Sequence, residues 1–125
     1  MSINESSFSI NVTAASGELF AGQFKVRRRL SHMQGLRRDE LRRELLGAKP
    51  EFAPPELQKN AYILSTCAAY VFDAPRWWNE SDNGLALFDE EPVAAVFAEI
   101  SKVIKGVADE LDAKAKKSTE VMKAD

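Results

Sequence analysis

The chain has 125 residues, a formal net charge of -2 and 45% hydrophobic residues. This length fits one domain that can bury about two thirds of its unfolded surface, so the core needs no metal or disulfide. One cysteine and one histidine are too few for a disulfide framework or a zinc site, and the opening MSINESSFSI lacks the basic and apolar regions of a signal peptide.

Two segments near the N-terminus predict a β-hairpin. Every second side chain in residues 7–14 is apolar, which is typical of a half-buried strand. Residues 20–27 have the same period, and residues 15–18 have the composition of a turn. Because a lone hairpin is only marginally stable in water, we expect it to pack on helices or to join strands from other copies.

The next segment, Leu30–Leu46, predicts a helix with an arginine-rich exposed side. Ser31 can serve as its N-cap, and Gly47 is placed to end it. Gly35 weakens a helix by about 1 kcal/mol relative to alanine, which allows a later start near Leu36. Residues 48–55 contain three prolines and predict an extended connector.

The most apolar stretch, residues 56–72, predicts a mostly buried central helix. Its apolar face consists of Leu57, Ala61, Leu64, Ala68 and Val71, and its wetted edge of Gln58, Lys59, Ser65 and Thr66. It is shorter than the roughly 20 apolar residues that cross a bilayer, so we expect no membrane span. Cys67 lies inside this helix and is interpreted as a small buried hydrophobe rather than a nucleophile.

Pro75 disfavours helical geometry in Ala74 and is expected to end the central helix, which leaves Trp77 and Trp78 on a loop. Two adjacent indoles are hard to bury together on a loop. We therefore expect Trp77 to cap the core and Trp78 to face a partner, although the order could be reversed. With the apolar patch after the following polar loop, the candidate partner-binding residues are Trp77, Trp78, Leu85, Leu87 and Phe88.

The sequence Asp89-Glu90-Glu91-Pro92 is typical of a helix start. An apolar stripe from Val93 to Leu111 predicts a long helix that lies along the central one. The expected core consists of Leu57, Leu64, Val71, Val96, Phe97, Ile100 and Ile104. The predicted fold is therefore mainly α, with a two-stranded hairpin packed on a bundle of three main helices in residues 1–112. Residues 113–125 predict a frayed helix or a flexible charged tail.

Charge is spread unevenly along the chain. Seven arginines precede the central helix: Arg27, Arg28, Arg29, Arg37, Arg38, Arg42 and Arg43. Residues 80–99 contain six acids and no base. This contrast predicts head-to-tail self-association or binding of a charged partner through the arginines. The arginines could also contact phosphates, but the interleaved acids and the acidic balance argue against nucleic acid.

No catalytic constellation is evident in the sequence. It has no glycine-rich phosphate loop, and the acids at 89–91 are interpreted as partners of a helix dipole rather than as a general acid and base. We expect a protein that is not an enzyme and has no catalytic residues, metal site or cofactor.

Three motifs occur in a characteristic order. A short β segment leads into FKVRRRLSHMQGLRRDELRREL, the helix NAYILSTCAAYVFDAPRWW follows, and an acidic spacer leads into FDEEPVAAVFAEISKV. From Phe20 to Val103 this order resembles the small tail assembly chaperones of long-tailed phages. The most specific parts are Ala74-Pro75 with Trp77-Trp78, and residues 92–100. The arginine-rich first helix departs from that pattern.

The resemblance implies a non-enzymatic, self-associating chaperone in the host cytoplasm. Such a protein coats the tape-measure protein, helps to recruit tail-tube subunits and is absent from the finished virion. Two other classes remain open, namely a structural or connector protein of the virion and a small nucleic-acid-binding regulator that uses the arginines. An apolar groove for a long amphipathic helix is compatible with the chaperone interpretation.

Overall fold

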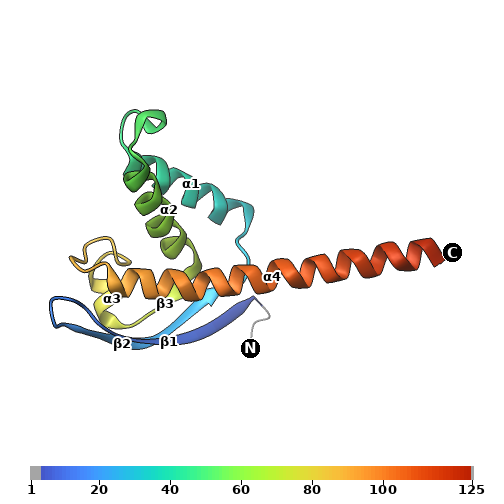
Figure 1. The fold of residues 1–125 in the computed structure, drawn as a ribbon, viewed down its shortest axis with the longest axis horizontal. Helices are drawn as coiled ribbons and strands as arrows, with labels where there is room; N and C mark the ends of the chain where they lie inside the picture. Colours follow the sequence, from blue (N-terminus) through green and yellow to red (C-terminus); the bar gives the residue numbers. More distant parts are fainter. Residues whose placement is uncertain (1–3, 125) are drawn as a thin grey trace.

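The computed structural model describes the backbone of residues 4–124 and the side chains of residues 4–117. A three-stranded sheet and the long helix α4 (Glu91–Ala124) form the body, and helices α1 (His32–Leu46) and α2 (Pro55–Tyr70) form an arm that stands away from it (Figure 1). The remaining elements are β1 (Glu5–Thr13), β2 (Leu19–Arg27), the 3-10 helix η1 (Pro50–Phe52), β3 (Val71–Asp73) and α3 (Arg76–Glu80).

The sheet is antiparallel in the order β1-β2-β3. The two predicted strands are present and pair in continuous register from Glu5↔Arg27 to Thr13↔Leu19. The expectation of a two-stranded hairpin was incomplete, because β3 pairs with β2 at Val26↔Val71. Val71 and Phe72 were assigned to the end of the central helix. Their β-branched and aromatic side chains favour a strand once the edge of β2 is available.

The core lies between one face of the sheet and the helices α2, α3 and α4. Its buried side chains come from Ile10, Phe24 and Val26 in the sheet, Cys67, Tyr70, Val71 and Trp78 in the middle of the chain, and Val93, Val96 and Ile100 in α4. The expected core residues Val71, Val96 and Ile100 are therefore confirmed, and Leu64, Phe97 and Ile104 pack against the core while partly buried. The prediction that Leu57 belongs to the core was wrong, because its side chain is 38% exposed near the outer end of the arm.

The expected bundle of three main helices does not form. Helix α1 contains no buried residue and packs mainly against α2, while α4 packs against both α2 and β1. The charged sequence of α1 offers too narrow an apolar stripe to join a bundle core. The wetted edge assigned to α2 was also wrong at two positions, since Ser65 and Thr66 are buried. The Ser65 hydroxyl donates to the carbonyl oxygen of Tyr62 at 3.2 Å.

The helix ends follow the local sequence closely. Ser31 caps α1 in a capping box with Gln34, and Gly47 ends it at a φ of 88°. Gly35 does not delay the start, because the box already holds the first turn. At the other end of the chain, helix α4 continues through Ala124, so the segment predicted as a frayed helix or a flexible tail is helical there, and side chains 108–117 are all exposed.

Candidate partner-binding clefts

The tryptophan pair lies in the five-residue helix α3 rather than on a loop. Trp78 is 0% exposed and packs edge-on against Phe24, with 5.3 Å between the ring centroids. Trp77 is partly buried, and its indole N–H donates to the carbonyl oxygen of Ala21 at 2.9 Å. The expectation that Trp78 faces a partner was wrong, because the short helix turns both indoles toward the sheet.

The loop after α3 closes over Trp78. Gly84 has a φ of 88°, and a Cβ atom on it would lie 2.8 Å from the Trp78 ring. This close approach requires glycine. The large apolar side chains that follow in the loop are less buried: Leu85 and Leu87 are partly buried, and Phe88 is fully exposed.

These three residues border a groove of about 400 Å³ between the loop, α2 and the start of α4, which we call the Phe88 groove. Its apolar lining is Ile63, Leu64, Leu85, Leu87, Phe88, Val93 and Ala94. The charged residues around it are Glu56, Asp89 and Glu90, with Lys59 as the base. Of the predicted partner-binding residues, Leu85, Leu87 and Phe88 therefore line this groove, whereas Trp77 and the buried Trp78 do not.

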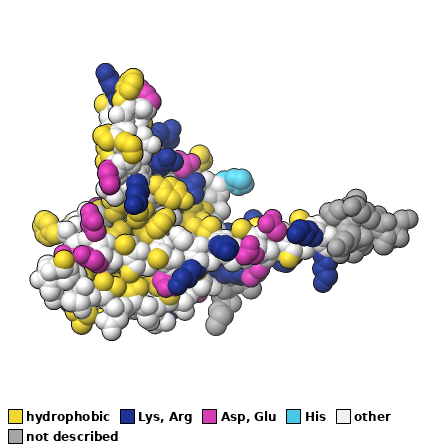
Figure 2. All heavy atoms as spheres, viewed as in Figure 1, with side chains coloured by type: hydrophobic (Ala, Val, Ile, Leu, Met, Phe, Trp, Pro, Cys, Tyr) yellow, Lys and Arg dark blue, Asp and Glu magenta, His cyan; other side chains and the backbone are white. Residues whose placement is uncertain are grey.

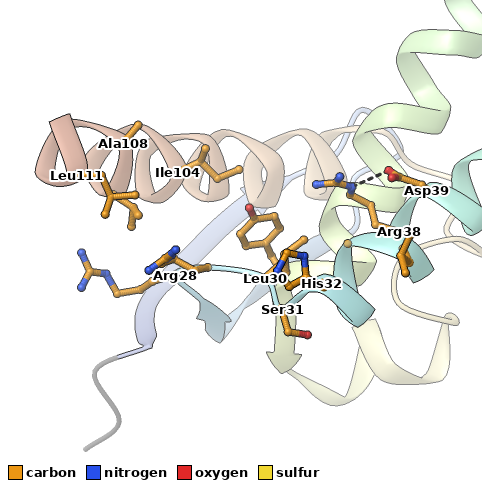
Figure 3. A pocket seen from close by; sticks show the side chains of 14 residues that line it. Arg28, Leu30, Ser31, His32, Arg38, Asp39, Ile104, Ala108 and Leu111 are labelled. Atoms are coloured by element: carbon orange, nitrogen blue, oxygen red, sulfur yellow. Dashed lines mark hydrogen bonds and ion pairs between the residues drawn. The ribbon is translucent and has the colours of Figure 1, made fainter. Parts of the chain in front are cut away.

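A second and larger opening, of about 580 Å³, lies between the start of α1 and the middle of α4 (Figure 3). We call it the arginine cleft. Its apolar lining is Leu30, Leu36, Tyr70, Ile104, Val107, Ala108 and Leu111, and its polar lining includes Arg28, Arg29, Ser31, His32, Arg38 and Asp39. Leu36 is 62% exposed and Leu111 44%, so two large apolar side chains lack cover here.

The charge of the arginine cleft is positive, with three arginines against one aspartate among its lining residues. Arg28 pairs with Glu110 at 2.6 Å, and Arg38 pairs with its neighbour Asp39 at 3.1 Å. Both pairs are partly exposed, and such pairs contribute only about 0–1 kcal/mol. A carboxylate on a bound partner can therefore exchange with the intramolecular acids at little cost.

The seven arginines do not form one continuous face. Arg27 donates to the carbonyl oxygen of Ala69 at 2.9 Å and lies over the Phe72 ring, which fixes it at the end of α2. Arg42 lies over the Tyr62 ring on the arm. Arg37 lines a smaller pocket between α1 and α2, and Arg43 occupies the last turn of α1. Figure 2 shows Lys and Arg side chains along the side of the arm that faces the C-terminal part of α4, which protrudes from the body in Figure 1.

Cys67 does not supply a nucleophile. Burial raises the pKa of its thiol to about 12, so the thiolate is not populated near neutral pH. His32, in contrast, is exposed at the mouth of the arginine cleft. Within the described part of the chain, no three His, Cys, Asp or Glu side chains gather as a possible metal site.

Comparison with family models, curated proteins and solved structures gives no match. Among the described residues, no helix is long and apolar enough to cross a membrane. Sequence reasoning missed the arginine cleft, because it assigned Ile104 to the core and gave Leu111 no partner.

Proposed function

We propose that this chain is a non-catalytic tail assembly chaperone of a long-tailed phage, and that its arginine cleft holds an amphipathic helix of the tape-measure protein. One observation carries the proposal: apolar side chains of two helices share an opening whose rim is arginine. The order of the sequence motifs supports the same class of protein. The proposed client, the proposed partnership with tail-tube subunits and the proposed location in the host cytoplasm are based on that resemblance.

The walls of the arginine cleft suit a helical ligand. Ile104, Val107 and Leu111 follow one another at i, i+3 and i+7 along α4. Val107 is buried and Ile104 partly buried, so Leu111 offers the most exposed apolar surface of this row to a second helix. Leu36 on α1 supplies the facing wall. The exposed half of α4 continues beyond the cleft, so a long client helix can extend along it (Figure 1). This is the helix-in-groove mode of recognition, with anchors at helical spacing.

The rim determines which helix binds. Arg28, Arg29 and Arg38 favour carboxylates beside the apolar anchors of the client, because guanidinium groups bind carboxylates in a planar, bidentate arrangement. A client helix with lysines at the same flanks would meet like charges. The proposed client segment is therefore an amphipathic helix whose apolar stripe is bordered by glutamate or aspartate.

The affinity of a synthetic probe tests the proposed cleft. The probe is a helix of about 20 residues, roughly 30 Å long, with an apolar stripe flanked by glutamates. We expect Leu111→Asp to weaken its binding at least about tenfold, because the change places an acid at an anchor site. Titration calorimetry of the intact protein measures the loss. A probe with lysine flanks should bind at least about tenfold more weakly than the glutamate probe.

The control is Phe88→Asp, which makes the same chemical change at an exposed position in the Phe88 groove. It should change the affinity by less than about twofold. Strong loss in Phe88→Asp with none in Leu111→Asp would move the client site to the Phe88 groove. Equal affinity for the glutamate and lysine probes would contradict the proposal that the arginines select carboxylates on the client.

A further inference from the structure

Among the described residues, no strand pairs with the outer edge of β1. Asn4 accepts from the backbone N–H of Arg28 at 3.0 Å, and Ala14 donates to Glu18 at 2.9 Å. Along an antiparallel strand, the backbone N–H and C=O groups of successive residues point alternately toward and away from the neighbouring strand. The two bonds therefore show that the even-numbered residues between them bond to β2. The backbone N–H and C=O groups of Ser7, Ser9 and Asn11 therefore point away from β2. They have no hydrogen-bond partner among the described backbone (residues 4–124) and side chains (residues 4–117).

This edge lacks the devices that normally prevent pairing with another strand. Edge strands are usually short, bulged, or carry lysine or proline. β1 is nine residues long, pairs with β2 without a register shift, and contains only one charged residue, Glu5. The opposite edge differs, because β3 has three residues and its pairing with β2 includes a register shift.

We propose that a second copy of this chain pairs with β1 along this edge, antiparallel, about a twofold axis at Ser9. In this register Ser9 faces Ser9, Ser7 faces Asn11 and Glu5 faces Thr13, and all of these are residues whose backbone groups point outward. The lone acid meets a threonine, so no like charges face each other. The two sheets then form one continuous sheet.

The inner face of the sheet favours a second copy over an unrelated strand. Phe8 and Val12 are only partly buried at the border of the core. In the same register Phe8 faces Ile10 of the other copy, and Val12 faces Ser6. The apolar side chains at the border of one core therefore lie next to those of the other copy. A shift by one residue would turn these side chains to the solvent face, so this face also fixes the register.

The test is the mass of the protein as a function of concentration, by sedimentation equilibrium, with amide exchange measured in parallel. We expect a dimer whose Ser7, Ser9 and Asn11 amides become protected as the concentration rises. Ser9→Pro should weaken dimerisation at least about tenfold, because it removes a donor at the axis. The monomer should keep its fold, since that N–H makes no bond in one copy and proline is tolerated on an edge.

Ser9→Lys provides a second disruption without proline, because it places like charges opposite each other at the axis, while Ser9→Thr should preserve the dimer.

A monomer at every concentration would overturn the inference, as would a dimer that Ser9→Pro and Ser9→Lys leave unchanged. A dimer that dissociates in about 0.5 M salt, where the Debye length is only a few ångströms, would assign the contact to charged faces instead. Protection of these amides only when the glutamate probe is present would assign the edge to the client instead of a second copy. No residue of the β1 edge lines the arginine cleft, so failure of the Leu111→Asp experiment and failure of the dimer test are distinguishable.

Discussion

Replacement of Trp78 by alanine is expected to destabilise the fold by about 3–5 kcal/mol, the usual cost of removing a large aromatic side chain from a core. Trp78 is fully buried, and it packs between Phe24 of the sheet and the loop at Gly84. Backbone hydrogen bonds hold the loop, among them Ala86 N–H to the carbonyl oxygen of Ser81 at 2.8 Å, so the loop cannot collapse fully into the space left behind. Urea unfolding followed by circular dichroism measures the loss of free energy.

Trp77→Ala is the matched control, since the same side chain is removed from the adjacent position. Trp77 is only partly buried, whereas Trp78 is 0% exposed, although Trp77 also makes edge-on contacts with the buried rings of Phe20 and Phe24. We expect a loss smaller than that of Trp78→Ala by at least about 1 kcal/mol. Equal losses, or a larger loss for Trp77→Ala, would contradict the assignment of Trp78 as the central aromatic residue of the core.

Gly22→Ala is expected to cost about 2–5 kcal/mol through backbone strain and steric overlap together. Gly22 has a φ of 150°, and a Cβ atom there would lie 2.3 Å from Cγ of Pro75. Pro75 begins the turn that carries both tryptophans, so the methyl group would push α3 away from the sheet. Thermal and urea unfolding of the variant measure the effect.

Gly17→Ala separates the two contributions. Gly17 also has a positive φ, of 91°, but a Cβ atom there would meet nothing within 4 Å. We expect it to cost only about 1–2 kcal/mol, from the backbone alone. If Gly22→Ala were no more destabilising than Gly17→Ala, the close contact between β2 and Pro75 would not be a constraint on the fold.

The parts of the fold that local sequence determines were predictable. The period of two in the first 27 residues gave both strands of the hairpin, because one face of this sheet is buried and the other is exposed. Ser31 with Gln34 gave the start of α1, and the apolar stripe of α4 gave Val96 and Ile100 as core residues. Each of these depends on neighbours within one or two turns.

The third strand and the arm depend on distant contacts. Val71 continues the helical spacing of α2, and only its pairing with Val26 makes it a strand. Leu57 has the same spacing but is 38% exposed, since α2 leaves the body at a steep angle and carries Leu57 away from the core (Figure 1). Periodicity indicates which face of a helix is apolar, but not how far along the helix that face is covered.

The candidate site was predictable only in part. Phe88 was expected to be accessible and is, because the acids after it begin α4 and leave it outside. The arginine cleft joins residues 28–39 to residues 104–111, which are far apart in the chain. One signal existed in the sequence: the apolar stripe of the last helix extends to Leu111, beyond the part that the expected core could cover.

The most direct test of the proposed cleft is a methyl NMR titration of the intact protein with the glutamate-flanked helical probe. Isoleucine, leucine and valine methyl groups report separately on the two sides of the arm. If the arginine cleft is the client site, the methyl signals of Leu36, Ile104 and Leu111 shift as the probe is added, and those of Leu85 and Leu87 do not. Shifts confined to Leu85 and Leu87, or no methyl shift at a saturating probe concentration, would contradict the assignment of the client helix to the arginine cleft.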